Sequence, residues 1–357
     1  MKKKLTILIS TLNWGLGHSC RTTPIIKAFL KENCNVILAG YGNAGEFLKK
    51  EFPDLEYIHF PGIDISYPAK GNMALKMLLS TYYIFKTIRK EHKELEKIIS
   101  EKKIDLVFSD NRYGLWSKKI PSIFLTHQLF IQTPQRLKFL KPLINKINHY
   151  YIKRFTECWI PDFEEEENLS GDLSHSKKIS FPHHYIGSLT RFKKSDTTKN
   201  NSVFVIISGP EPQRTIFEEK IFDNISSINV NIIIAKGKAD ESYSNINTKN
   251  TTVISHPGTT EMEKLLNSSS LIISRPGYST LMDLAILEKT AVFVATPGQT
   301  EQEYLAKRHN GKQFISIKQS DFSLLDAIKK GKLLVGSSKY QHNNFKLEKN
   351  IKRIVRG

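Results

Sequence analysis

The chain has 357 residues, enough for two domains of ordinary size, and its 39% apolar and 25% charged residues are typical of a globular protein. No segment approaches the roughly 20 apolar residues of a membrane-spanning helix, and three scattered cysteines indicate neither a disulfide framework nor a zinc site, which fits a reducing cytoplasm. The formal net charge of +18 favours an anionic partner, namely a nucleotide sugar, an anionic membrane surface or nucleic acid, although a lysine-rich proteome would give the same excess.

Short apolar runs alternate with longer amphipathic stretches along the whole chain, which predicts parallel sheets covered by helices. In the first half, strands are expected at 5–10, 35–39, 56–60, 104–109, 121–126 and 157–160, and helices at 21–31, 44–50 and 72–99. A polar stretch at 192–201 is the expected linker. Strands then follow at 203–207, 231–235, 251–255, 271–273, 290–295 and 313–317, and a final helix at 339–355. The predicted fold class is therefore α/β, with two Rossmann-like domains facing each other across a cleft.

A glycine-rich loop connects the first expected strand to the first expected helix. Gly15 and Gly17 allow close approach of a ligand, but Cys20 replaces the third glycine of Gly-x-Gly-x-x-Gly, which disfavours a nicotinamide dehydrogenase. His18 should project from the carboxyl edge of the sheet, where a neutral imidazole could take a proton from an acceptor hydroxyl. Asp110 ends a strand of the same domain and could orient His18 by a hydrogen bond. A histidine that merely packs at a helix start is the alternative.

A second glycine turn follows the apolar run 271–273 and opens a helix at Gly277. The first N–H groups and the dipole of this helix would suit a phosphate, and Asp283, in its second turn, could reach the hydroxyls of a ribose. An ordinary strand-to-helix turn with a polar cap is the alternative. The loop 296–304, after the next strand, is rich in amide and carboxylate side chains. Together the two segments suggest a nucleotide end and a sugar end of one binding site.

Residues 271–306 resemble the C-terminal half of the two-Rossmann-domain (GT-B) glycosyltransferases of family 28, which includes the enzyme that adds N-acetylglucosamine to the lipid-linked peptidoglycan precursor. The resemblance implies an acceptor domain at 1–191, joined by the final helix 339–357, and a nucleotide-sugar domain at 192–338. It assigns the donor diphosphate to Gly277, Tyr278, Ser279, Arg191, Arg275, Ser208 and Gly209, the ribose to Asp283, the base to the backbone of Ile254 and Ser255, the sugar to Gln299, Gln302 and Glu303, and the acceptor side to Gly15, Gly17, His127 and Gln128.

The sequence contains no Asp-x-Asp, which predicts that no metal holds the diphosphate and that no cofactor is needed. We expect a UDP-sugar to be used with inversion at the anomeric carbon: His18 deprotonates an acceptor hydroxyl, and the helix at Gly277, with Arg275 and Arg191, stabilises the departing diphosphate. The resemblance implies N-acetylglucosamine or a related hexose as the sugar. Glu303 stands where the family has a glutamine, and a carboxylate accepts but does not donate hydrogen bonds, so a sugar other than N-acetylglucosamine is open. The alternatives are a UDP-sugar 2-epimerase of the same fold and a nucleic-acid-binding protein, the latter disfavoured because no arginine patch, zinc knuckle or RNP-type motif occurs.

The stretch 136–154 carries six Lys or Arg residues, no acidic residue and many apolar ones. This composition suits peripheral docking on anionic lipid, and hence a lipid-linked acceptor at the inner face of the plasma membrane. An apolar stripe that faces the protein's own core is the alternative.

Overall fold

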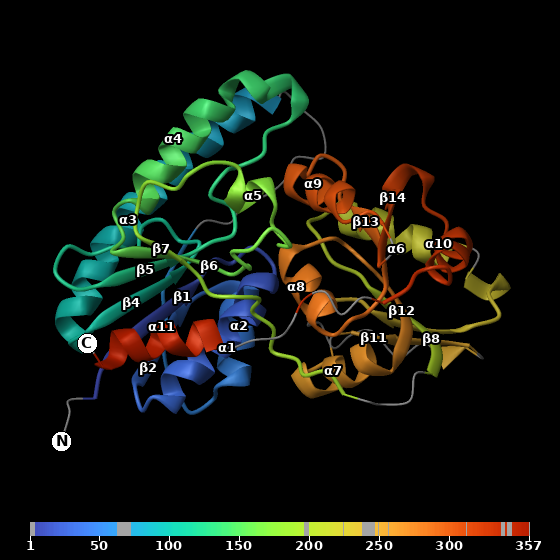
Figure 1. Cartoon of the computed structure of the whole chain (residues 1–357), viewed down its shortest axis with the longest axis horizontal. Helices are drawn as coiled ribbons and strands as arrows, with labels where there is room; N and C mark the ends of the chain where they lie inside the picture. Colours follow the sequence, from blue (N-terminus) through green and yellow to red (C-terminus); the bar gives the residue numbers. More distant parts are fainter. Residues whose placement is uncertain are drawn as a thin grey trace. The chain divides into compact units, whose positions relative to one another are not determined.

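The computed structural model describes residues 4–62, 73–195, 200–223, 225–237, 247–248, 250–255, 257–311, 313–336, 340 and 345–356. These form two compact units, Met1–Leu189 with His342–Gly357 (unit 1) and Thr190–Gln341 (unit 2) (Figure 1). Residues 196–199 of the expected linker, the expected boundary at 338 and 339, and residues 341–344 of the expected final helix lie outside the described residues. Within those ranges, no helix combines the length and the apolar character that a bilayer span requires.

Unit 1 is built on a seven-stranded parallel sheet of order β3-β2-β1-β4-β5-β6-β7. Its strands are β1 Thr6–Thr11, β2 Asn35–Gly40, β3 Glu56–His59, β4 Leu106–Asp110, β5 Ser122–Leu125, β6 Glu157–Ile160 and β7 His183–Tyr185. The central strands are buried on both faces, which is why they appear in the sequence as continuous apolar runs. Strand β7 was not predicted, because its two histidines and one tyrosine form no apolar run.

The helices of unit 1 include the C-terminal one. They are α1 Gly17–Lys31, α2 Gly42–Glu51, α3 Met73–Lys102, the 3-10 helix η1 Gln135–Leu140, α4 Lys141–Ile152, α5 Asp172–His175 and α11 Phe345–Arg356. Helix α11, red in Figure 1, packs against α1 and buries Leu347 and Ile351. Arg353 of α11 donates to both carboxylate oxygens of Glu157, at 2.7 and 2.9 Å. The last described residues therefore belong structurally to the first half of the chain.

Helix α1 begins at Gly17, four residues earlier than predicted, and Pro24 lies inside it rather than at its start. Its buried face is unusually polar, since Arg21, Thr22 and Thr23 are almost inaccessible. The early start places His18 in the first helical turn.

Unit 2 contains the second seven-stranded sheet, of order β10-β11-β9-β8-β12-β13-β14, in which only β10 is antiparallel to its neighbour. Its strands are β8 Asn200–Ile206, β9 Asn231–Ala235, β10 Asn247–Thr248, β11 Thr251–Ile254, β12 Ser269–Ser274, β13 Ala291–Ala295 and β14 Phe314–Lys318. Its helices are α6 Gln213–Phe222, η2 Ile225–Ser227, α7 Thr259–Ser268, α8 Tyr278–Ile286, α9 Thr300–Arg308, η3 Gln319–Asp321 and α10 Leu324–Gly331. In each unit the carboxyl ends of the parallel strands meet at one edge, where ligands of open α/β sheets bind.

Candidate functional site

Asp110 is the centre of a buried polar cluster in unit 1. It ends β4, is fully buried, and its Oδ2 accepts hydrogen bonds from Arg21 Nε at 2.8 Å and Thr22 Oγ1 at 2.9 Å. Its Oδ1 contacts a second nitrogen of Arg21 and lies 2.8 Å from Nδ1 of His18. Burial alone would raise the pKa of this carboxyl, but the charges and hydrogen bonds of Arg21 and His18 outweigh it and hold the pKa well below its usual range. Asp110 is therefore a carboxylate at neutral pH.

The charge of Asp110 fixes the tautomer of His18. A carboxylate oxygen only accepts hydrogen bonds, so the 2.8 Å contact with Oδ1 places the proton on Nδ1 and leaves Nε2 as the nitrogen that accepts. A terminal nitrogen of Arg21 also lies 3.0 Å from this Nδ1, and in this tautomer it donates to Oδ1 of Asp110 instead. The His18 side chain is 14% exposed, and no hydrogen bond to its Nε2 occurs within the described part of the chain. The cluster thus presents an oriented imidazole whose outer nitrogen is able to take a proton.

Arg21, which was not among the predicted site residues, connects this pair to His127, which was. Its side chain is 2% exposed, and one of its terminal nitrogens lies 2.9 Å from Nδ1 of His127, which therefore accepts. His127 thus contacts the cluster, whereas Gln128 is held through its backbone: its N–H donates to Thr126 Oγ1 and its carbonyl accepts from Asn148. A basic residue three positions after His18, on the same helical face, was the available signal.

The glycine loop of unit 1 is held by Asn13. Its Oδ1 accepts a hydrogen bond from the backbone N–H of Ala44 at 3.1 Å, at the start of α2. Gly15 has a φ of +76°, and no described atom lies within 4 Å of the position that a Cβ would take there. Gly17 is the first residue of α1. The loop therefore leaves room beside the start of α1.

In unit 2, several buried polar groups without partners gather at the carboxyl ends of β12 and β13. Gly277 is the N-cap residue of α8, in the turn that follows β12. Tyr278 is buried and Ser279 half-buried in the first turn of the helix. The Ser274 hydroxyl, the Thr296 hydroxyl and Oε1 of Gln299 have no hydrogen-bond partner among the described residues. Because buried polar groups in folded proteins nearly always find partners, these three atoms are suited to the polar groups of a ligand.

The side chain of Arg275 is buried inside unit 2. Its side chain is 1% exposed and donates to three backbone carbonyls, those of Val294 and Gln213 at 2.9 Å and that of Ser208 at 3.4 Å. Burial lowers its pKa to about 10, so the guanidinium is still charged at neutral pH. Three of its five N–H groups thus donate to carbonyl oxygens, and the expected contact of Arg275 with a diphosphate stays a prediction.

Asp283 of α8 and Arg191 contact neighbouring residues and influence each other electrostatically. Thr190 Oγ1 donates to Oδ1 of Asp283 at 2.5 Å, and Arg191 donates to Thr259 Oγ1 at 3.0 Å. Burial raises the pKa of Asp283 to about 7, although the Thr190 hydrogen bond and the Arg191 charge act in the opposite direction. The residues expected at the ribose and at the diphosphate are thus close enough to interact electrostatically.

The remaining predicted residues of unit 2 lie at the start of α9 and in the loop after β8. Oε1 of Gln302 accepts from the N–H of Thr296 at 2.9 Å, and Oε1 of Glu303 accepts from the N–H of Gly298 at 2.8 Å. Both side chains thus order the loop between β13 and α9. Ser208 and Gly209 are exposed after β8, and Gly209 has a φ of +111° that favours glycine.

The expected base-binding segment ends β11. Ile254 and Ser255 are half-buried, and the carbonyl of Ile254 accepts a hydrogen bond from the N–H of Lys236 at 3.0 Å.

Comparison with known proteins supports the fold class. Residues 210–352 match the glycosyltransferase family 28 C-terminal domain, whereas a search of curated proteins finds no match. The glycosyltransferase SnogD from Streptomyces nogalater is a structural relative with a TM-score of 0.61 at 12% identity, covering 99% of this chain and 95% of that chain. MurG from Acinetobacter baumannii has a TM-score of 0.57 at 12% sequence identity, covering 99% of both chains. The UDP-GlcNAc 2-epimerase from Methanocaldococcus jannaschii has a TM-score of 0.57 at 14% sequence identity, covering 99% of this chain and 100% of that chain. The predicted class of two Rossmann-like α/β domains is confirmed.

Proposed function

Because the chain is a glycosyltransferase of the GT-B fold with a family 28 C-terminal domain, we propose that it transfers a hexose from a UDP-sugar to an acceptor hydroxyl. The observation that carries the proposal is the His18 and Asp110 pair, an oriented base at the carboxyl edge of the unit 1 sheet. Unit 2 binds the donor in this proposal, and unit 1 supplies the base. The transferred sugar is N-acetylglucosamine or a related hexose.

The donor site is assigned to the carboxyl edge of the unit 2 sheet. The start of α8 at Gly277, with the backbone of Tyr278 and Ser279, receives the diphosphate, because a helix N-terminus carries partial positive charge. Arg191 and the turn at 208–209 flank this position in the proposal. The partnerless hydroxyls of Ser274 and Thr296 support a polar ligand here.

The rest of the donor is placed on either side of the diphosphate. The carboxylate of Asp283 accepts hydrogen bonds from the ribose hydroxyls, and the backbone at 254–255 faces the base. Gln299, with its partnerless Oε1, and the loop ordered by Gln302 and Glu303 contact the sugar.

The proposed chemistry is a single displacement with inversion. Nε2 of His18 takes the proton of the acceptor hydroxyl while that oxygen bonds to the anomeric carbon and the bond from this carbon to the diphosphate oxygen breaks. The Asp110 carboxylate stabilises the imidazolium that forms, as it already accepts the Nδ1 proton. The helix dipole at Gly277 stabilises the negative charge that develops on the diphosphate.

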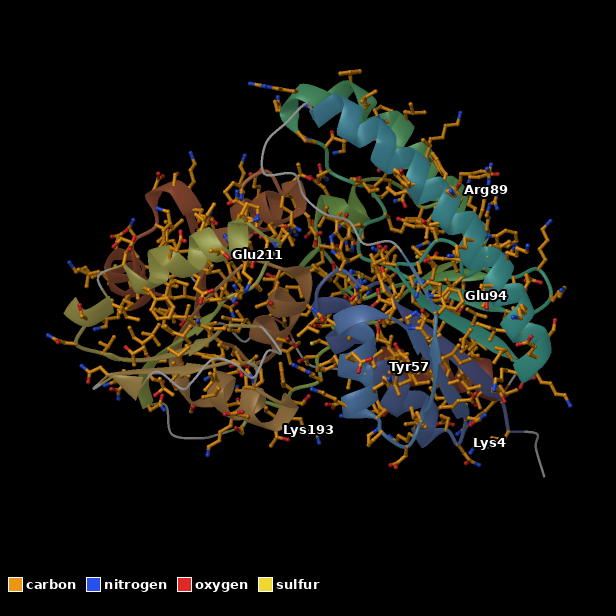
Figure 2. The ribbon with its side chains drawn as sticks, turned by 180° about the vertical axis from the view of Figure 1, so that it is seen from behind. Lys4, Tyr57, Arg89, Glu94, Lys193 and Glu211 are labelled. Carbon is orange, nitrogen blue, oxygen red and sulfur yellow. The ribbon has the colours of Figure 1, made fainter. Side chains whose placement is uncertain are left out.

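The acceptor is proposed to be lipid-linked because an apolar and basic surface covers η1 and α4. Phe139, Leu143 and Ile147, spaced by four residues, are 75%, 56% and 37% exposed, and Tyr150 is 57% exposed. We call these four residues the α4 surface. The exposed basic residues of the same segment are Arg136, Lys138, Lys146 and Lys153. Helix α3, which contacts α4 through Phe85 and Tyr151, carries the exposed Arg89 (Figure 2). The buried face of α4 instead carries Asn148 and Ile152, so these four apolar side chains do not face the protein's own core.

This composition supports peripheral binding to anionic lipid at the inner face of the plasma membrane. A transferase at that surface would meet an acceptor carried on a lipid.

A turnover assay tests the proposal and separates it from the UDP-sugar 2-epimerase alternative, which the fold of the Methanocaldococcus jannaschii enzyme motivates. Purified protein is incubated with labelled UDP-N-acetylglucosamine and UDP-glucose, with and without bacterial membrane extract. Label that moves to a lipid-extractable product only in wild-type protein, and not in His18→Ala, supports the transferase. An epimerised nucleotide sugar formed without extract supports the epimerase instead. Absence of any turnover with every sugar and extract contradicts both.

A further inference from the structure

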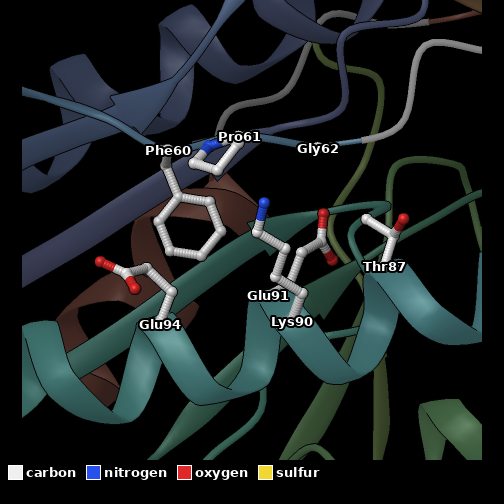
Figure 3. A pocket seen from close by; sticks show the side chains of 7 residues that line it. All are labelled: Phe60, Pro61, Gly62, Thr87, Lys90, Glu91 and Glu94. Carbon is white, nitrogen blue, oxygen red and sulfur yellow. The ribbon is translucent and has the colours of Figure 1, made fainter.

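Two arginines, Arg112 in unit 1 and Arg275 in unit 2, are among the largest fully buried side chains of the protein. Each follows a strand of its sheet at the carboxyl end and donates to the loops there. Arg112 donates to Oε1 of Glu91 at 2.7 and 3.1 Å and to the carbonyl of Pro61 at 2.6 Å. Glu91 and Pro61 line a small cavity of about 90 Å³ (Figure 3). The charge of Arg112 is therefore neutralised inside unit 1.

Arg275 has no such counter-charge in the described residues. Its three hydrogen bonds go to backbone carbonyls, and its guanidinium lies 4.2 Å from the centre of the Phe217 ring. Carbonyl dipoles and an aromatic face stabilise a cation but do not neutralise it. A buried charge without an opposite charge is unfavourable, so this site should favour the approach of an anion.

The three carbonyls belong to three different segments of unit 2, and one of them, at Ser208, is part of the proposed donor site. Ser208 follows β8, Gln213 is the first residue of α6, and Val294 lies in β13. Arg275 itself stands two residues before Gly277, the cap of α8. One side chain therefore fixes the relative positions of the loop at 208–209, the start of α6 and the end of β13 beside the start of α8.

Gly209 brings this loop close to the guanidinium. A Cβ at Gly209 would lie 3.7 Å from Nε of Arg275 and 3.4 Å from the partnerless hydroxyl of Thr296. The buried charge is thus separated from the exposed turn by about one layer of backbone. It can act on a bound anion without contacting it.

We propose that Arg275 is a positioning residue of the donor site and that its buried charge is the built-in counter-charge for the donor diphosphate. The inference rests on the proposed function, because it assumes a nucleoside diphosphate at this edge of unit 2. The inference gives Arg275 two roles. It holds the three segments in place through its hydrogen bonds, and its positive charge compensates the negative charge of the ligand. Only the second role depends on whether the ligand carries phosphate.

Calorimetric titrations with UDP and uridine distinguish the two roles. Arg275→Gln removes the charge, Arg275→Lys keeps it, and Lys329→Gln, at an exposed position of α10, is the control for the loss of one positive charge. We expect Arg275→Gln to weaken UDP binding by about tenfold or more while uridine binding changes by no more than about twofold, and we expect Arg275→Lys to recover most of the UDP affinity. Lys329→Gln should bind both ligands as the wild type does.

Equal weakening of UDP and uridine in Arg275→Gln, or no recovery in Arg275→Lys, overturns the inference. So does unchanged UDP binding in Arg275→Gln when the wild type binds UDP, and that result leaves the proposed function intact. A wild type that binds no UDP, TDP or ADP overturns the proposed function and the inference with it.

If Arg275→Gln does not fold, the inference is tested instead by melting curves of the wild type and Arg275→Lys with and without inorganic pyrophosphate. An equal rise of the melting temperature in the wild type and Arg275→Lys supports the inference. No rise in the wild type, or a smaller rise in Arg275→Lys, contradicts it.

Discussion

Nδ1 of His18 lies 2.8 Å from Oδ1 of Asp110, although 92 positions of sequence separate the two residues. They meet because β1 pairs with β4 in parallel, so that the helix following β1 starts next to the residue that ends β4. The carboxylate fixes the tautomer, and Arg21 and Thr22 fix the carboxylate. The same contacts that stabilise the fold of unit 1 therefore orient the proposed base.

Replacing His18 should remove catalysis and spare donor binding. We expect His18→Ala to lower kcat by a factor on the order of 10² to 10⁴, which is the usual contribution of a general base. UDP affinity, measured by calorimetry, should stay within about twofold because the proposed donor contacts lie in unit 2. A variant that keeps wild-type kcat would exclude His18 as the base.

Replacing Asp110 should destabilise unit 1 in a pH-dependent way. Asp110→Asn leaves the buried guanidinium of Arg21 without its carboxylate, which typically costs about 3–5 kcal/mol. Because the pKa of Asp110 is lowered in the folded protein, its stabilisation is complete above the ordinary carboxyl pKa of about 4 and is lost as the pH falls through the folded value. Urea unfolding should thus show a gap between wild type and variant at pH 7 that narrows below about pH 4.

The exposed ion pair of Asp326 with Lys330 offers the control, since Asp326→Asn should cost no more than about 0.5 kcal/mol. A gap that stays constant down to acidic pH would show that the Asp110 charge is not what stabilises the cluster.

Asp283 should show the opposite pH dependence. Its pKa is raised to about 7, so the folded state keeps a proton that the unfolded state has already lost, and stability falls as the pH rises from about 4 to 7. We expect Asp283→Asn to be more stable than the wild type at pH 8, by on the order of 1 kcal/mol, with the difference shrinking towards pH 4. The same variant should bind UDP more weakly if the carboxylate accepts from the ribose.

The exposed Asp321 provides a matched control, because Asp321→Asn should leave the pH profile of the wild type unchanged. Thermal melts at pH 5 and pH 8 measure both variants, and a wild type whose stability does not fall over this range would contradict the assignment.

The α4 surface should govern binding to lipid. Replacing Phe139 and Leu143 together by serine removes two side chains that are more than half exposed, and should weaken co-sedimentation with phosphatidylglycerol vesicles by about tenfold or more. Added salt should weaken binding of the wild type through its lysines and arginines. Leu333→Ser, at an 82% exposed position of unit 2, should bind vesicles as the wild type does. Vesicle binding that does not change with salt, lipid charge or these substitutions would contradict membrane docking by the α4 surface.

Transfer should proceed in the presence of a chelator. The proposed mechanism stabilises the leaving diphosphate with the start of α8 and nearby cationic groups, so EDTA should change the rate by less than about twofold. The assay is the labelled transfer reaction with and without EDTA, followed by added manganese. A rate that collapses with EDTA and returns with manganese would require a different account of the leaving group.

The sequence by itself determined the fold class and the strands of both sheets except β7 and β10. Parallel strands covered on both faces must be apolar throughout, as Ile7, Leu8 and Ile9 of β1 are, so each one stands out without any knowledge of its neighbours. Gly277 and the loop before His18 were recognisable for a similar local reason, because a turn from strand to helix requires glycine or a cap nearby. Signals of this kind lie within ten consecutive residues.

Only the tertiary structure decided what the polar side chains do. The early start of α1 follows from the contacts of His18, Arg21 and Thr22 with Asp110, which outweigh the cost of Pro24 inside the helix. Arg275 has the spacing expected of a phosphate ligand, yet its side chain turns inward to three carbonyls from distant segments. The direction of such a side chain depends on which strand ends lie next to each other, and that order is set by the packing of the whole sheet.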